Sequence, residues 1–162
     1  MFREMRRIKQ LLSPEDTIAV MERCTNGVLA CLGDEDYPYA VPLSYVYFNG
    51  KIYFHSAKAG HKIDAVTKYP KVSFSVIDED TIVSEEYTTY FRSVIAFGKA
   101  RIAEDNERLE AFKALVEKYS GDQPEADKHK EIAGCTHAHI VAIDIEHMSG
   151  KEAIEYVRAK QK

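Results

Sequence analysis

Tyr53-Phe-His-Ser-Ala-Lys-Ala-Gly-His-Lys-Ile-Asp64 is the most informative stretch of this chain. An apolar strand ends there in a turn of small residues, and the turn opens a helix that begins with a histidine and a lysine. Free backbone N–H groups and the positive end of the helix dipole suit a phosphate at such a point, and Lys62 adds a mobile positive charge. Gly60 lacks a Cβ where a ligand oxygen would approach the backbone. The local pattern therefore indicates either a phosphate site or an ordinary strand-to-helix turn.

The composition is that of an ordinary soluble protein. The chain has 162 residues, and we expect one domain over residues 1–162. A formal net charge of −4 favours neither a nucleic acid nor an anionic membrane as a partner. No apolar stretch is long enough to cross a bilayer and no signal peptide opens the chain, so the expected compartment is the cytoplasm. The three cysteines are widely spaced and odd in number, which predicts buried thiols rather than disulfides.

Hydrophobic periodicity and turn signals predict about six strands with about three helices between them. Ser13-Pro14 starts a helix, because serine caps and proline suits the first helical position. Asn49-Gly50 between two apolar runs predicts a hairpin, since both residues tolerate positive φ. Gly98 marks a bulge or a close backbone approach in a long strand. We expect strands at residues 28–32, 39–48, 51–55, 72–77, 87–103 and 137–145, helices at 14–24, 62–69 and 105–119, a turn at 78–80, a loop or marginal helix at 121–134, and a short helix or tail at 151–162.

This order of elements predicts a mainly β fold. Hairpin connections outnumber strand–helix–strand units, which argues against a doubly wound sheet. A closed or partly open antiparallel β-barrel with peripheral α-helices fits the pattern better.

Three stretches of the sequence carry a resemblance to a known family. Pro38-Tyr-Ala-Val-Pro-Leu-Ser-Tyr45 precedes the hairpin, His55-Ser-Ala-Lys-Ala-Gly-His-Lys62 follows it, and Tyr69-Pro-Lys-Val-Ser-Phe74 comes next. Together they resemble the FMN-binding split barrels, which are the pyridoxamine 5′-phosphate oxidase-like proteins, and within them the branch of nitroimidazole-resistance (Nim) reductases. The resemblance covers nearly the whole chain. It implies an antiparallel FMN-binding split barrel and a homodimer with FMN at the subunit interface.

The resemblance also implies the flavin contacts. The Val-Pro-Leu-Ser strand would run beside the isoalloxazine ring, with its main chain on the pyrimidine edge. The turn would lie along the ribityl chain and the helix start would hold the phosphate, which agrees with the local pattern. A later strand would reach the flavin of the partner subunit. The implied cofactor-binding residues are Val41, Pro42, Leu43, Ser44, His55, Ser56, Ala57, His61, Lys62, Arg92 and Ser93.

The sequence departs from the pyridoxamine oxidases at two points. Those enzymes carry an Arg-x-Trp pattern near the C-terminus, whereas this chain has no Trp, which argues against vitamin B6 oxidation. His61 stands where the oxidases usually have arginine. Because histidine is only partly charged near neutral pH, we expect FMN affinity to be weaker or pH-dependent.

One further residue could act in catalysis, and one further group of residues has side chains that can bind a metal. His55 is a candidate catalytic residue, as a donor of a proton or hydrogen bond near the flavin; otherwise it packs the turn. Cys135, His137 and His139 are expected to share one strand face. Three ligands in a row on a flat strand do not easily surround one ion, so no metal site is predicted.

The leading functional hypothesis is an FMN-dependent, Nim-like oxidoreductase. Reduced flavin would pass electrons to a small acceptor such as a nitro compound, and NAD(P)H or another donor would recharge it. Because the cofactor carries the chemistry, no separate nucleophile is required. The alternatives are a flavin-binding protein without turnover, serving storage or sensing, and the same fold with haem or a deazaflavin.

Overall fold

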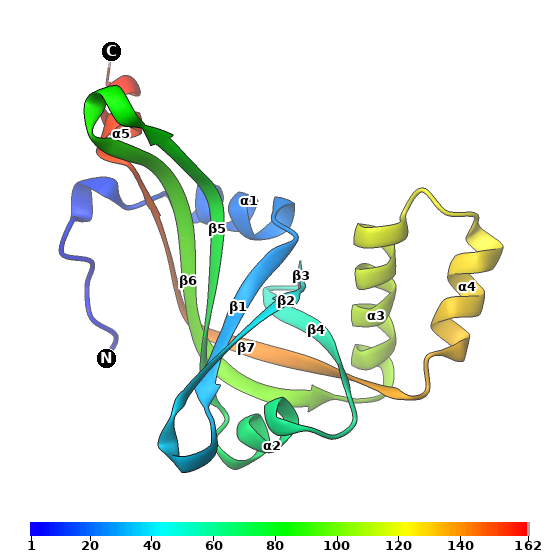
Figure 1. Cartoon of the computed structure of the whole chain (residues 1–162). Coiled ribbons are helices and arrows are strands. Elements are labelled where there is room, and N and C mark those ends of the chain that lie inside the picture. Colours follow the sequence, from blue (N-terminus) through cyan, green and yellow to red (C-terminus); the bar gives the residue numbers. More distant parts are fainter. Residues whose placement is uncertain (162) are drawn as a thin grey trace.

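Seven antiparallel strands form one sheet that curls into a barrel (Figure 1). The computed structural model describes residues 1–161. The strand order is β2-β1-β5-β6-β7-β4-β3. The strands are β1 (Asn26–Leu32), β2 (Pro38–Ser44), β3 (Val46–Phe48), β4 (Lys51–Ala57), β5 (Lys71–Val83), β6 (Thr88–Ala103) and β7 (Ala138–Glu152). The mainly β, antiparallel fold predicted from the sequence is confirmed.

The helices lie around this barrel (Figure 1). They are α1 (Pro14–Arg23), α2 (His61–Lys68), α3 (Asp105–Ser120), α4 (Glu125–Gly134) and α5 (Ile154–Ala159). The helix α2 covers one end of the barrel, α3 and α4 form an arm beside it, and α5 lies at the far end of the long β5–β6 hairpin. None of the helices within residues 1–161 combines the length and hydrophobicity that a membrane span requires.

The chain passes from one edge of the sheet to the other at Tyr45. The single strand expected at residues 39–48 is instead β2, which pairs with β1, followed by β3, which pairs with β4. Tyr45 between them is fully buried, and its hydroxyl donates to the carbonyl oxygen of Met21 at 2.8 Å. In the sequence, apolar residues alternate with other residues through Tyr45, so this periodicity alone does not reveal that the strand is divided there. This residue links the two edge strands through the core.

Three local signals in the sequence form the structures that they predict. Ser13 accepts a hydrogen bond from the backbone N–H of Asp16 at 3.0 Å and caps α1. Asn49 and Gly50 have φ of 48° and 72° and join β3 to β4. The ladder between β6 and β7 shifts register at Gly98, where an added Cβ would lie 2.2 Å from the Asp144 carbonyl oxygen.

Three other expectations were wrong or only partly right, and one open alternative was decided. The acidic residues 78–80 lie within β5 rather than in a turn, because that strand continues with β6 into a long hairpin. For residues 121–134 a loop and a marginal helix were both left open, and the helix alternative is confirmed, since residues 125–134 form the regular helix α4. Cys135 follows α4 and β7 begins only at Ala138, so Cys135, His137 and His139 do not share a strand face. The apolar face of α3 is not wholly buried, since Leu109 is 39% exposed.

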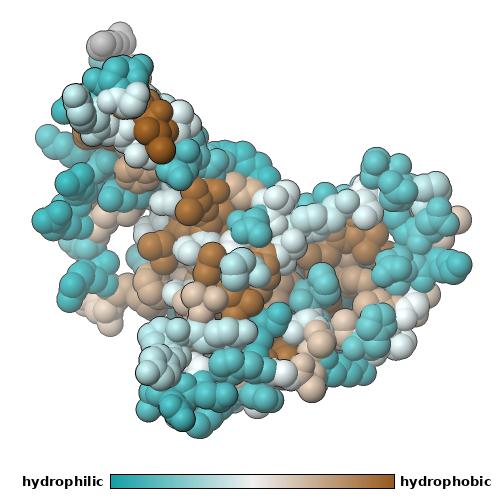
Figure 2. Space-filling model, viewed as in Figure 1, coloured by the Kyte–Doolittle hydropathy of each residue, from teal (hydrophilic) through white to brown (hydrophobic). Residues whose placement is uncertain are grey.

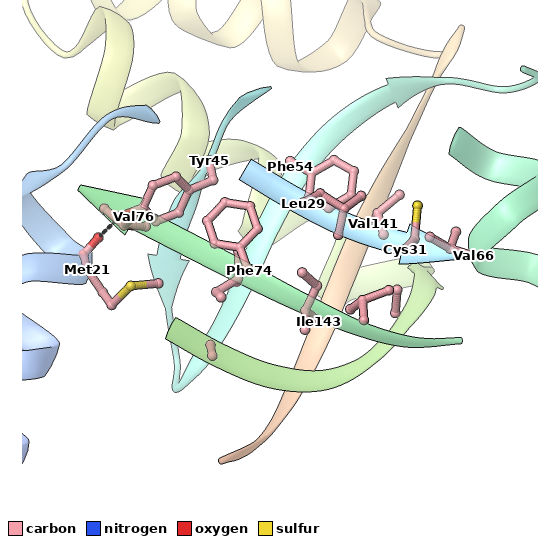
Figure 3. Close-up of a cluster of buried hydrophobic side chains, with 14 of the residues drawn as sticks. Met21, Leu29, Cys31, Tyr45, Phe54, Val66, Phe74, Val76, Val141 and Ile143 are labelled. Atoms are coloured by element: carbon pink, nitrogen blue, oxygen red, sulfur yellow. Dashed lines mark hydrogen bonds between the residues drawn. The ribbon is translucent and has the colours of Figure 1, made fainter. Parts of the chain in front are cut away.

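Two hydrophobic clusters lie on opposite faces of β4. Phe54 points into the barrel, where Leu29, Phe74 and Ile143 surround it (Figure 3). Tyr53 points the other way and belongs to the cluster beneath α3. Successive residues of a strand face opposite sides, so His55 is on the α3 side as well. This alternation decides which residues of β4 meet which part of the candidate site.

Candidate functional site

The turn between β4 and α2 presents free backbone donors. Gly60 is the N-cap of α2 with φ of 124°, a conformation that L side chains rarely adopt. Its carbonyl accepts the first helical bond from the N–H of Asp64 at 3.1 Å. The N–H groups of residues 61–63 precede this bond and have no acceptor within the helix. Open space surrounds the position that a Cβ of Gly60 would take. The turn is therefore shaped to receive an anion.

Lys62 supplies a partly buried positive charge at the same place. Its Nζ lies 5.6 Å from the centroid of the Phe54 ring, and burial lowers the pKa of the ammonium group. Within residues 1–161 it takes part in no ion pair. Holding a half-buried ammonium without a carboxylate costs stability in the free protein. A bound anion would offset that cost.

His61 is held by its own chain. Its ring stacks on Tyr39 with centroids 4.1 Å apart, and its Nε2 accepts the backbone N–H of Asp34 at 3.2 Å. The same nitrogen lies 3.8 Å from the Asp34 carboxylate. The imidazole thus ties the start of α2 to the β1–β2 connection. In this arrangement the contribution of His61 to the turn is its main-chain N–H.

Two strand edges near the turn have unpaired main-chain groups. Within the described residues β2 pairs only with β1, so the other edge of Val41, Pro42, Leu43 and Ser44 is free. The strand β4 pairs with β3 only as far as Tyr53, which leaves one edge of residues 54–57 free. Such edges offer N–H and C=O groups to a ligand.

The side chains along these edges differ in burial. Val41 and Leu43 are half-buried against the barrel core, whereas Pro42 and Ser44 are exposed. On β4, Ser56 is buried while His55 and Ala57 are exposed. The structure thus brings nine of the eleven expected residues onto two strand edges and one helix start: Val41, Pro42, Leu43, Ser44, His55, Ser56, Ala57, His61 and Lys62.

Arg92 and Ser93 are not part of this group within one chain. They lie on the β5–β6 hairpin, at the end of the molecule away from α2 (Figure 1). The Arg92 guanidinium donates to Asp78 at 3.1 Å and lies 3.5 Å from the Glu79 carboxylate. The hydrogen bond from Arg23 does most to lower the pKa of Asp78 to about 2, and the bond from Arg92 adds to it against the opposing effect of burial. Sequence reasoning missed this ion network, because acidic residues in a row resemble a turn.

A cavity of about 580 Å³ lies between β4 and the α3–α4 arm. Ser44 and His55 form part of its wall, and the rest comes from α3, α4, the segments that connect α3 to α4 and α4 to β7, and the start of β7. Figure 2 shows hydrophobic surface in the hollow between the barrel and this arm. Little in the sequence indicates the cavity, since its outer wall is α4, where the sequence left a loop and a marginal helix open. The apolar stripe of α3 is its one local signal.

Comparison with known proteins identifies the family. The family model described as pyridoxamine 5′-phosphate oxidase matches residues 13–152. The chain belongs to this family. The resemblance predicted from the three stretches is thereby confirmed. No curated protein sequence matches the chain.

Solved structures share the fold of this family member. A conserved hypothetical protein from Mycobacterium tuberculosis has a TM-score of 0.78 at 22% identity, over 92% of this chain and 90% of that one. A candidate 5-nitroimidazole antibiotic resistance protein from Bacteroides thetaiotaomicron has a TM-score of 0.72 at 20% identity, over 88% and 86%. A FAD-binding protein from Mesorhizobium loti has a TM-score of 0.60 at 25% identity, over 89% and 97%. The fold is therefore that of the flavin-binding split barrels.

Proposed function

We propose that this protein is an FMN-dependent oxidoreductase of the Nim-like kind. The observation that carries the proposal is Lys62: a half-buried ammonium without an ion pair in residues 1–161, beside three free N–H groups of a helix start. An FMN phosphate would complete both features. A dianionic group at a helix N-terminus is also favoured by the helix dipole.

The free edges of β2 and β4 are suited to the rest of the cofactor. In this proposal the main chain of Val41–Ser44 binds the pyrimidine edge of the flavin, and His55–Ala57 follow the ribityl chain. Pro42 has no N–H and so limits which groups of that edge can donate. These contacts orient the ring, and the barrel beneath it excludes water from one face.

The second subunit enters the proposal through exposed apolar residues on the β5–β6 hairpin. Ile82 is 78% exposed and Tyr87 98% exposed, and hydrophobic side chains appear along this hairpin in Figure 2. Apolar residues exposed together on a projecting hairpin favour a protein interface. In a homodimer the hairpin would bring Arg92 and Ser93 to the partner's flavin, as the resemblance implies.

FMN, when bound, supplies two-electron transfer between a nicotinamide and a small acceptor. With a nitro compound as acceptor, two electrons and two protons convert the nitro group to a nitroso group and release water, while NAD(P)H is oxidised. In this proposal the protein binds and orients the ring, and His55, which is exposed on β4 and lines the cavity, donates a hydrogen bond near the flavin.

The chromophore of the purified protein tests the proposal. We expect a flavin absorbance spectrum, and FMN in the supernatant after heat denaturation. Released haem or deazaflavin would assign the fold to another cofactor, and a colourless protein that takes up no added FMN would refute the proposal. Multiple turnovers of a nitro compound with NAD(P)H then separate a reductase from a flavin-storage or sensing protein.

A further inference from the structure

The cavity beside β4 has the size and lining of a small-molecule site. Its volume of about 580 Å³ lies within the range typical of ligand pockets. Phe112, Leu115 and Val116 of α3 form an apolar wall. A wall of aromatic and aliphatic side chains favours a planar aromatic molecule over a flexible polar one.

The charges at the rim select against anions. Asp127 and Glu131 of α4 line the cavity together with one lysine, Lys128, and two histidines, His55 and His137. That lysine is already neutralised, because its Nζ lies 2.6 Å from Glu125 and 3.0 Å from Glu117. An anionic ligand would therefore meet an excess of carboxylates, whereas a neutral or cationic one would not.

The inner wall of the cavity is shared with the candidate flavin site. Ser44 ends β2 and His55 lies on the free part of β4, and both line the cavity. A ligand in the cavity would thus lie beside residues that the proposed function assigns to the flavin. The remaining wall comes from α3, α4, the start of β7 and the segments that connect them, which contribute none of the expected flavin contacts.

We infer that this cavity binds the electron acceptor, and that the acceptor is a flat aromatic molecule that is neutral or cationic. Its role as acceptor site rests on the proposed function, but its binding selectivity does not. NAD(P)H, whose phosphates are anionic, is excluded from this cavity and approaches the flavin from elsewhere.

Three nitroaromatic probes of nearly equal shape test the charge selectivity. They are para-nitrobenzyl alcohol (neutral), para-nitrobenzylamine (cationic) and para-nitrobenzoate (anionic). Equilibrium dialysis of each probe against the FMN-loaded protein measures Kd without turnover. We expect the alcohol and the amine to bind at least about tenfold more tightly than the benzoate. Equal binding of all three probes would overturn the inference.

Charge-neutralised variants locate the selectivity. The double variant D127N/E131Q removes both rim carboxylates from exposed positions of α4. It should bring the Kd of the benzoate to within about threefold of that of the alcohol. Glu22→Gln, an exposed carboxylate on α1 that lines no described cavity, is the matched control and should keep the tenfold gap. A tenfold difference between the Kd of the benzoate and that of the alcohol that persists in the double variant would contradict the assignment of the selectivity to Asp127 and Glu131.

Steric variants locate the site itself. Val116→Trp fills the apolar wall, and Gln123→Trp narrows the entrance from an exposed position that leaves the core intact. Each should weaken binding of para-nitrobenzyl alcohol about tenfold or more while the Kd of FMN stays the same. Unchanged probe binding in both variants would overturn the inference. If the protein takes up no FMN, the proposed function fails, and the same titrations on the protein as purified still decide whether the cavity binds the probes.

Discussion

Replacing Lys62 by methionine should change stability and FMN affinity in opposite directions. Methionine keeps the length and apolar stem of lysine but has no charge to hold in the half-buried position over Phe54. Removing the desolvated ammonium should stabilise the cofactor-free protein by about 0.5–1 kcal/mol, as substitutions that relieve functional strain commonly do. For a domain of this size that corresponds to a rise in Tm of about 1–4 °C.

The loss in affinity follows from the bond that the ammonium would make with a phosphate. A hydrogen bond to a charged group contributes about 1.5–3 kcal/mol. Since about 1.4 kcal/mol is a factor of ten, Lys62→Met should raise the Kd for FMN about 10- to 100-fold. The three main-chain N–H groups of α2 remain, so binding should weaken without being abolished.

Fluorescence titration of FMN and thermal unfolding of the cofactor-free protein measure the two effects. Lys58→Met is the matched control, because Lys58 is an exposed cation of the same turn outside the helix. It should change the Kd less than about threefold and leave Tm unaltered. An unchanged Kd in Lys62→Met would refute the phosphate assignment, and a lower Tm would show that the ammonium serves the fold rather than a ligand.

Two further substitutions test contacts that hold the fold together. Gly98→Ala should destabilise the protein by about 1–3 kcal/mol in urea unfolding, because the added Cβ would lie 2.2 Å from the Asp144 carbonyl oxygen. Gly134→Ala is the control and should be neutral or stabilising, since a Cβ there meets nothing within 4 Å. Equal effects of the two substitutions on the free energy of unfolding would contradict the close approach at Gly98. The pKa of Asp78 is about 2 in the folded chain against an ordinary 3.8, so its pairing with Arg23 stabilises the fold fully above about pH 4 and loses that contribution as the pH falls toward 2. Asp78→Asn should therefore cost about 1–2 kcal/mol at neutral pH and little near pH 2, and a cost independent of pH would argue against the ion pair.

The sequence predicted those parts of the structure that depend on local chemistry. The cap of α1, the Asn49-Gly50 hairpin and the helix that begins after Gly60 each depend on residues a few positions apart. The barrel itself was predicted from the resemblance to a family, because stretches of sequence that match a family at a fixed spacing imply the topology of the whole chain. The irregularity at Gly98 was predictable as well, because a glycine inside a long apolar strand often marks a bulge or a close backbone approach.

The parts that were missed depend on contacts between distant elements. Nothing near Tyr45 shows that its ring enters the core and divides one strand into two. The helix α4 is polar, and its buried Lys128 pairs with Glu117 of α3 and with Glu125. Asp78 lies in an acidic run that resembles a turn, and only the folded chain brings Arg23 to it. The cavity could not be predicted for the same reason, since its walls come from elements far apart in the sequence.

The alternation of β4 is what allows one strand to serve two binding regions. Phe54 faces the barrel and supports the stem of Lys62, whereas His55 faces α3 and lines the cavity. The register of β4 is fixed by antiparallel pairing with β7 at every position from Lys51 to Ala57. A shift by one residue would exchange the two faces and separate the ammonium from the turn. The phosphate end and the acceptor end of the proposed site therefore depend on the same register between β4 and β7.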